Sequence, residues 1–228
     1  MKIALIGYGK MGHAIEDLAV GKGHKILCTV DNAAELNDKE ALVAASDVAI
    51  EFSTPNTATA NIEHCLRQHV PVVCGTTGWY DNYDEVIALC RQNDGTIFTA
   101  TNFSIGMNIM FAINERLAEL MHGRDDYRVS ITETQHIHKL DAPSGTAISL
   151  RQQIAPRLGV SESTIDIESI REGEVPGTHV VRYDSDIDTI TISHEAHSRK
   201  GLAAGALMAA EFVCGKKGIF TMKDLLGI

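Results

Sequence analysis

The first hundred residues alternate short apolar runs with stretches whose apolar side chains recur at helical spacing. The runs predict buried strands over residues 2–6, 25–30, 48–52, 71–74 and 96–99. The stretches between them predict helices over residues 11–20, from 53–55 onward, and over 84–91. Short strands that alternate with helices are typical of a parallel sheet with helices on both faces. We therefore predict that this half of the chain is a doubly wound α/β domain.

The pattern changes after Ser104. A long helix is predicted over residues 107–121, with its buried face made by Met110, Ile113, Leu117 and Leu120. Further strands are predicted over 127–135, 165–170, 180–183 and 187–193, and a helix over 147–158. Because helices do not separate all of these strands, we predict a second, α+β domain with a mixed, largely antiparallel sheet. Residues 201–213 form an apolar helix, followed by a Lys-Lys-Gly break and a last amphipathic turn.

Composition narrows the class of protein. The chain has 228 residues, 44% of them hydrophobic and 22% charged, as in an ordinary globular protein. Its net charge of −10 argues against nucleic acid as a partner, and no apolar run is long enough to span a membrane. The five cysteines form no C-x-x-C pair, so we expect free thiols, no metal site and a cytoplasmic location.

A glycine motif, Gly7-Tyr8-Gly9-Lys10-Met11-Gly12, joins the first predicted strand to the first predicted helix. A strand, G-x-G-x-x-G and a helix in this order are the dinucleotide-binding arrangement, here of the Rossmann type. Gly7 would permit the tight turn, Gly9 the approach of the pyrophosphate, and Gly12 the packing of helix on strand. The motif predicts a nicotinamide coenzyme on this loop.

Asp31 ends the second predicted strand, roughly twenty residues beyond the glycines, where the ribose 2′-OH of NAD is accepted. The next residue is Asn32, which offers no positive charge to a 2′-phosphate. We therefore predict a preference for NADH over NADPH. The alternative is that Asp31 is only a turn residue beside Asn32.

The fourth and fifth predicted strands each end in a polar turn. Gly75-Thr76-Thr77-Gly78 follows the fourth strand, and Ala100-Thr101-Asn102-Phe103-Ser104 follows the fifth. Open α/β sheets bind ligands at the carboxyl ends of their strands, which makes both turns candidates for the coenzyme site. The simpler interpretation is that they are flexible turns.

The segment from His136 to Thr146, HIHKLDAPSGT, concentrates the candidate chemistry. It carries two imidazoles, one ammonium and one carboxylate, and it ends in Ser144-Gly145-Thr146 at a predicted helix start. Backbone N–H groups at a helix start and nearby cations together bind small anions. The alternative is a solvated loop with a Pro-Ser-Gly turn and an N-cap.

Seven motifs in chain order resemble one family: Gly7 to Gly12, EFSTP (51–55), GTTG (75–78), NFSIGMN (102–108), HKLDAPSGTA (138–147), IREGEVPGTH (170–179) and ISHEAHSR (192–199). Together they are similar to 4-hydroxy-tetrahydrodipicolinate reductase, also called dihydrodipicolinate reductase. The resemblance implies NAD(P)H-dependent reduction of a cyclic dicarboxylate imine to tetrahydrodipicolinate in lysine and diaminopimelate biosynthesis. It also implies a homotetramer assembled through the second domain's sheet.

The same resemblance implies which residues form the site. The coenzyme would contact Gly7, Tyr8, Gly9, Lys10, Met11, Gly12, Asp31, Gly75, Thr76, Thr77, Ala100, Thr101, Asn102 and Phe103. The substrate carboxylates would contact His136, Lys139, Ser144, Gly145 and Thr146. The coenzyme domain would comprise residues 1–104 and 201–228, because the C-terminal helix of relatives returns to it, and residues 105–200 would bind substrate and oligomerise.

Gln135 departs from the family pattern, which has a histidine, commonly assigned as proton donor, at this position. Glutamine does not exchange a proton near neutral pH. The proton could come from Lys139 or an ordered water with Gln135 only positioning, or from His136 or His138, or the enzyme could be slow or have another role. We prefer Lys139 as both anchor and proton donor, since a buried lysine near other cations gives up its proton more readily.

For His136 and Lys139 to share a pocket, the chain must bend between them, because a straight strand would point them to opposite faces. His138 is then a supporting imidazole. His194 and Arg199 could add positive charge but are left outside the site. Two other functions stay open: a related amino-acid dehydrogenase, and a nucleotide-sensing protein that has lost turnover.

Overall fold

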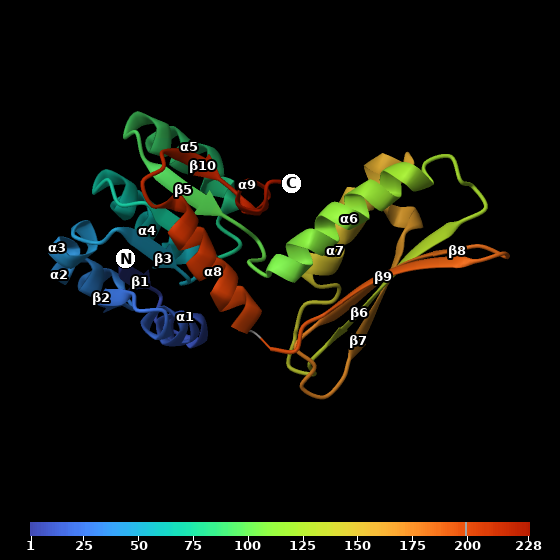
Figure 1. The fold of residues 1–228 in the computed structure, drawn as a ribbon, viewed down its shortest axis with the longest axis horizontal. Helices are drawn as coiled ribbons and strands as arrows, with labels where there is room; N and C mark the ends of the chain where they lie inside the picture. The colour runs from blue at the N-terminus through green and yellow to red at the C-terminus, as the bar shows by residue number, and fades with distance from the viewer. Residues whose placement is uncertain (199) are drawn as a thin grey trace. The chain divides into compact units, whose positions relative to one another are not determined.

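The computed structural model describes residues 1–198 and 200–228 and divides into two compact units. One unit comprises Met1–Ser104 and Lys200–Ile228, and the other comprises Ile105–Arg199. The C-terminal segment therefore belongs to the same unit as the N-terminus (Figure 1). Arg199, at the end of the last sequence motif, lies outside the described residues.

The first unit is built on a parallel sheet. Its described strands are β1 (Lys2–Ile6), β2 (Lys25–Val30), β3 (Val48–Glu51), β4 (Val72–Cys74), β5 (Thr96–Thr99) and β10 (Gly218–Phe220). They lie in the order β10-β5-β4-β3-β1-β2, and each neighbouring pair is parallel. Strand order reverses at β1, so the loops after β1, β2 and β3 meet at the switch point where such sheets bind ligands. The predicted doubly wound sheet is confirmed.

Helices cover both faces of this sheet. Helices α4 (Pro55–Arg67) and α5 (Tyr83–Gln92) bury Ile62, Leu66 and Val86 against one face. Helices α1 (Lys10–Gly21) and α8 (Lys200–Val213) pack against each other and the sheet (Figure 1). Four elements of this unit are not in the sequence prediction: α2 (Ala33–Asp38), α3 (Glu40–Ala44), the 3-10 helix η1 (Tyr80–Asn82) and β10. The predicted last turn is α9 (Met222–Leu226).

The second unit has helices over one mixed sheet. Its described strands are β6 (Arg128–Gln135), β7 (Asp166–Arg171), β8 (Thr178–Asp184) and β9 (Thr189–Glu195), in the order β7-β6-β8-β9. The β6–β7 pair is parallel, and β8 is antiparallel to both β6 and β9. Helices α6 (Ile105–Met121) and α7 (Gly145–Leu158) bury Met107, Leu150 and Ile154 in a core with Ile131 and Val181. The predicted α+β class is confirmed.

The buried face of α6 differs from the prediction. Ile113 and Leu120, predicted to be core, are 50% and 57% exposed. The buried stripe instead follows Met107, Met110, Asn114, Ala118 and Met121. Asn114 is tolerated in it because its amide donates to the Leu150 carbonyl and to Gln153 Oε1, each at 3.3 Å. Of the four predicted core residues, Met110 is buried and Leu117 packs against the core, whereas Ile113 and Leu120 face outward.

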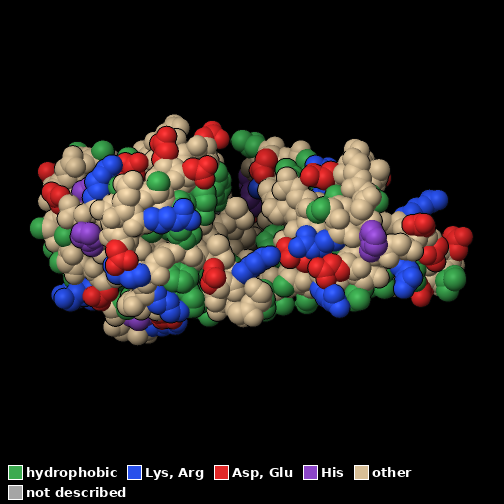
Figure 2. Space-filling model, turned by 90° about the horizontal axis from the view of Figure 1, so that it is seen from above, with side chains coloured by type: hydrophobic (Ala, Val, Ile, Leu, Met, Phe, Trp, Pro, Cys, Tyr) green, Lys and Arg blue, Asp and Glu red, His purple; other side chains and the backbone are tan. Residues whose placement is uncertain are grey.

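Basic and acidic side chains are interspersed on the face of the molecule that Figure 2 shows. Among residues 1–198 and 200–228, the helices are all too short or too polar to cross a bilayer.

Candidate active site

The glycine loop starts α1 at the carboxyl end of β1. Gly7 has a φ of +86°, and a Cβ on it would lie 2.0 Å from the Phe52 carbonyl oxygen, so only glycine fits. A Cβ on Gly12 would lie 2.6 Å from the Gly7 carbonyl oxygen. A Cβ on Gly9, in contrast, would have no described heavy atom within 4 Å beyond its chain neighbours. Gly7 and Gly12 are thus required by the fold, whereas the space beside Gly9 is open to a ligand.

Asp31 is held beside this loop. The Tyr8 N–H donates to Asp31 Oδ1 at 3.0 Å, while the side chain of Asn32 caps α2 by accepting from the Glu35 N–H at 3.0 Å. A cavity of about 140 Å³ next to Asp31 is lined mainly by apolar groups, among them Val30, Leu36 and Ala60. An exposed carboxylate beside an apolar cavity, at the end of β2, suits a ribose hydroxyl and an adenine ring.

The turn after β4 is tied to the turn after β3. A Cβ on Gly75 would lie 2.1 Å from the ring of Phe52, which explains the glycine there. Thr76 Oγ1 accepts from the Ser53 N–H at 2.8 Å, and the Thr76 carbonyl oxygen accepts from the Trp79 indole N–H at 2.9 Å. The Thr76 hydroxyl is therefore used internally, and the exposed Thr77 is the side chain of this turn that a ligand can reach.

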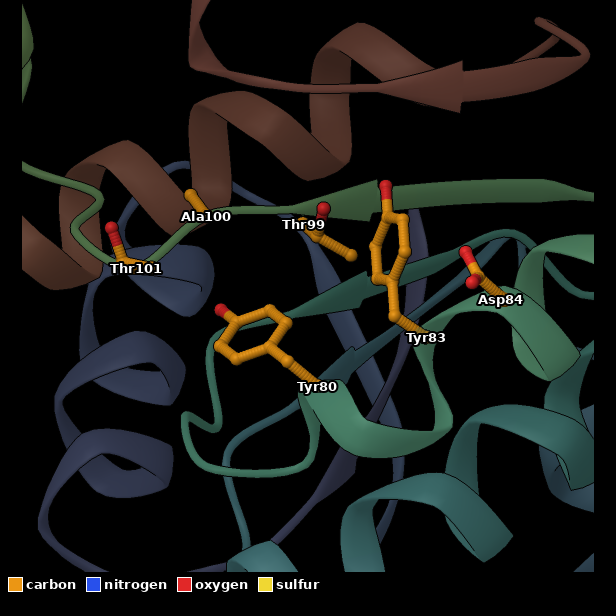
Figure 3. A pocket seen from close by; sticks show the side chains of 6 residues that line it. All are labelled: Tyr80, Tyr83, Asp84, Thr99, Ala100 and Thr101. Atoms are coloured by element: carbon orange, nitrogen blue, oxygen red, sulfur yellow. The ribbon is translucent and has the colours of Figure 1, made fainter.

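A second cavity, of about 470 Å³, lies at the carboxyl end of β5 (Figure 3). Its lining joins Thr99, Ala100 and Thr101 to Tyr80, Tyr83 and Asp84. Burial raises the pKa of Tyr80 to about 12, so its hydroxyl stays a neutral hydrogen-bonding group. Tyr80, Tyr83 and Asp84 were not among the predicted site residues, because no local motif marks them.

Asn102 and Phe103 shape the turn after β5. Asn102 Oδ1 accepts from the Ser104 N–H at 2.9 Å, and Phe103 is buried against Phe52 and Phe98. A Cβ on Gly205 of α8 would lie 1.7 Å from the Phe103 carbonyl oxygen. Because the Phe103 side chain lies in the core, only its backbone can contact a coenzyme.

In the second unit, the chain bends directly after β6. The Lys139 N–H donates to the His136 carbonyl at 3.1 Å, which closes a turn over residues 136–139. The bend that a shared pocket for His136 and Lys139 requires is therefore present. The His136 and His138 rings lie 6.0 Å apart, and His138 Nε2 is 2.9 Å from Glu174 Oε1 on the surface. His138 thus has a partner of its own, Glu174.

Lys139 has a carboxylate neighbour. Its Nζ lies 2.9 Å from Asp141 Oδ1, and its side chain is 25% exposed. The hydrogen bond from Lys139 lowers the pKa of Asp141. The sequence predicted other cations near Lys139, but its neighbour in the structure is the Asp141 carboxylate. A substrate carboxylate would have to displace Asp141 to bind Lys139.

Ser144 does not offer its polar groups to solvent. Its N–H donates to Glu133 Oε1 at 2.9 Å, and its Oγ accepts from the Ala147 N–H at 3.2 Å as the N-cap of α7. The side chain is 2% exposed. Both polar groups of Ser144 therefore have partners within this unit, so the predicted contact between Ser144 and a substrate would have to displace one of these bonds.

Gln135, the last residue of β6, is 8% exposed. A Cβ on Gly177, whose φ is +146°, would lie 3.2 Å from both the Gln135 amide nitrogen and oxygen. The glutamine side chain therefore packs against the backbone just before β8.

Two family models match the chain almost end to end. The model for the N-terminus of dihydrodipicolinate reductase matches residues 1–103, and the model for its C-terminus matches residues 106–226. The chain belongs to the dihydrodipicolinate reductase family. The resemblance inferred from the sequence motifs is confirmed.

Relatives and solved structures agree with this assignment. The chain is 47% identical to 4-hydroxy-tetrahydrodipicolinate reductase of Christiangramia forsetii, over 99% of this chain and 98% of the relative. It is 31% identical to that of Alkaliphilus metalliredigens over the full length of both. Its fold is similar to a dipicolinate-bound dihydrodipicolinate reductase from Paenisporosarcina sp. TG-14, with a TM-score of 0.81, 21% identity and 97% of each chain covered.

Three further residues of this dihydrodipicolinate reductase family member were missed by the sequence prediction. Glu133, Arg171 and His179 lie beneath the His136–Ser144 loop, and two of them, Glu133 and His179, are paired across β6 and β8. Glu133 shares a strand face with the core residue Ile131, two positions earlier. That alternation was the available signal, because a carboxylate at a core-facing position needs buried partners.

His179 should make the protein sensitive to acid. Burial lowers its pKa from 6.5 to about 4, against the opposing effect of Glu133, with His194 and Lys139 adding to the lowering. The unfolded chain takes up the proton first, so the free energy of unfolding should fall as pH drops from about 6.5 to about 4. Urea unfolding at pH 7 and at pH 4 gives the decrease in the free energy of unfolding between the two pH values. In His179→Gln this decrease should be about 3 kcal/mol smaller than in the wild type. Equal pH dependence in both proteins would contradict a neutral, buried His179.

Proposed function

We propose that this protein reduces 4-hydroxy-tetrahydrodipicolinate to tetrahydrodipicolinate with a nicotinamide coenzyme, a step of lysine and diaminopimelate biosynthesis. The observation that carries the proposal is the 47% identity, over 99% of the chain, to a 4-hydroxy-tetrahydrodipicolinate reductase. The buried polar groups and helix start around Lys139 support it, because the substrate is a dianion that needs two anion sites.

The residues of the first unit fit a dinucleotide. The open space beside Gly9 at the start of α1 suits a pyrophosphate, and Asp31 suits the ribose hydroxyls. Gly75 to Thr77 and Ala100 to Phe103 would complete the contacts, the latter beside the 470 Å³ cavity. The bound coenzyme would supply the hydride.

The second unit would hold the substrate and supply the proton. The N–H groups of Gly145 and Thr146 would bind one carboxylate at the α7 start, and Lys139, with His136 nearby, would bind the other after displacing Asp141. Gln135 cannot donate a proton and would position the substrate. The Lys139 ammonium is then our candidate for the proton donor.

The assay that tests this function is the oxidation of NADH at 340 nm, with substrate generated from pyruvate and aspartate semialdehyde. Substrate-dependent oxidation is expected. Binding of NADH without any substrate-dependent oxidation would favour a nucleotide sensor instead, for which Gln135 is the supporting feature.

We expect the enzyme to prefer NADH. Asp31 would meet a 2′-phosphate with like charge, and the nearby Lys39 ammonium is bound to Glu35 and to the Thr29 carbonyl, each at 2.7 Å. The kcat/KM for NADH should exceed that for NADPH by about tenfold or more. Asp31→Ser should reduce this ratio toward one, whereas Asp38→Ser, at the end of α2, should leave it unchanged. A clear NADPH preference of the wild type would refute the assignment of Asp31.

We further propose a cytoplasmic homotetramer. The described cysteines are free thiols, which suits a reducing compartment. Ile170 and Ile190, on the outer strands of the second unit's sheet, are each 38% exposed and would be covered by assembly through that sheet. Light scattering of the purified protein tests the subunit number.

A further inference from the structure

We propose that Glu133 and Arg171 are positioning residues that hold the 139–144 loop in the shape that binds a dicarboxylate. This inference rests on the proposed function, since the loop carries Lys139 and leads into the α7 start. The family resemblance assigns neither residue a role.

Glu133 holds the end of the loop. Its side chain is fully buried, and Oε1 accepts from the Ser144 N–H at 2.9 Å, the Ser169 hydroxyl at 2.8 Å and Arg171 Nη2 at 3.0 Å. Burial alone would raise the pKa of Glu133, but the bonds from Ser144, Ser169 and Arg171 outweigh it and lower the pKa. The carboxylate therefore stays charged and fixes the first residue before α7 to strand β6.

Arg171 holds the beginning of the loop. The same Nη2 also donates to the Asp141 carbonyl at 2.6 Å, and Nε donates to the Lys139 carbonyl at 3.4 Å. The planar guanidinium can reach a carboxylate and two carbonyls at once because its five N–H groups lie in one fork. The backbone on both sides of Leu140 is thus tied to the same ion pair that holds Ser144.

The buried Glu133–Arg171 ion pair is explained better by the shape of the loop than by the stability of the protein. A buried ion pair contributes little net stability compared with apolar residues of similar volume. Here the pair lies under a segment with few apolar anchors, since Leu140 is 98% exposed and Asp141 and Ala142 are also exposed. The spacing between the Lys139 ammonium and the α7 start therefore depends on Glu133 and Arg171, and two carboxylates bind tightly only when that spacing is kept.

Arg171 also neutralises the Glu133 carboxylate, whose negative charge would otherwise repel the dianionic substrate. Glu133 lies directly beneath Ser144, and His179 Nε2 is 3.7 Å from its second oxygen, but the low pKa of His179 keeps that imidazole neutral. Among the described residues, Arg171 is consequently the cation whose charge balances that of the Glu133 carboxylate.

The test uses dipicolinate, a stable aromatic dicarboxylate, as the probe for the anion site. Arg171→Lys keeps the positive charge but loses the fork, and it should raise the dipicolinate Kd in calorimetry by about tenfold or more. The Kd for NADH, measured by fluorescence, should stay within about twofold of wild type, since the change lies in the other unit. Arg182→Lys is the matched control, because Arg182 lies on β8 of the same sheet and pairs only with the exposed Asp184 among the described residues.

An unchanged dipicolinate Kd in folded Arg171→Lys would overturn the proposal, as would an equal weakening of NADH binding. If Arg171→Lys does not fold, Ser169→Ala takes its place, with an expected rise in the dipicolinate Kd of about two- to threefold; an unchanged Kd there also overturns it. Wild type that binds dipicolinate but fails to oxidise NADH with substrate would contradict the proposed function alone. Wild type that does not bind dipicolinate would refute both.

Discussion

Replacing Lys139 by alanine is expected to lower kcat by about 10²- to 10⁴-fold, the range for loss of a general acid. Lys139 is the only lysine between residues 105 and 199, so the second unit holds no other lysine that could replace it. Its ammonium lies 2.9 Å from Asp141 in a turn fixed by the backbone bond to His136. Steady-state oxidation of NADH, with the dipicolinate Kd measured in parallel, gives the two effects separately.

Lys139→Arg separates anchoring from proton donation. Arginine keeps the charge but does not give up its proton in proteins, so KM should recover toward the wild-type value while kcat stays low. Recovery of kcat in Lys139→Arg would show that the proton comes from another group, with His136 the first candidate. Arg116→Ala, which removes an exposed cation from α6 of the same unit, should leave both constants unchanged.

Gly7→Ala and Gly9→Ala are expected to fail in different ways. At Gly7 the new Cβ would meet the Phe52 carbonyl at 2.0 Å with a φ of +86°, so the free energy of unfolding should fall by about 3–5 kcal/mol. At Gly9 the new methyl group would meet open space, so stability should change by about 1 kcal/mol at most. The methyl group would occupy the proposed pyrophosphate site, and the Kd for NADH should rise by about tenfold or more.

Urea unfolding and NADH fluorescence titration measure the two effects. An unchanged NADH Kd in folded Gly9→Ala would mean that the coenzyme does not approach the backbone at this position. A Gly7→Ala protein as stable as wild type would mean that the loop can move away from Phe52.

The strands with a strong apolar pattern were predictable from the sequence, and those with little pattern were not. β1 and β5 match their predicted bounds because each is a short apolar run that is buried on both faces of a parallel sheet. β10 has three residues after a lysine pair, too few to show a period, and its pairing with β5 is a long-range contact. α2 and α3 are similarly short, and Lys39 between them interrupts the apolar spacing.

The site was predictable where one segment carries several chemical groups, as from His136 to Thr146. It was not predictable where the partners come from different strands. Ser169 and Arg171 of β7 meet Glu133 of β6 only through the parallel register, which pairs Ser169 with Glu133 and Arg171 with Gln135. The Ser144 N–H likewise donates to Glu133, which is eleven residues away in the sequence. Because the local sequence does not show this partner, the serine was expected to face the substrate.

A crystal structure of the wild type with dipicolinate and NADH tests the central claim most directly. One carboxylate should lie within about 3 Å of Lys139 Nζ and the other within about 3 Å of the Gly145 or Thr146 backbone nitrogen, with the pyrophosphate against Gly9. Dipicolinate bound on a surface that includes neither Lys139 nor the start of α7 would contradict the account.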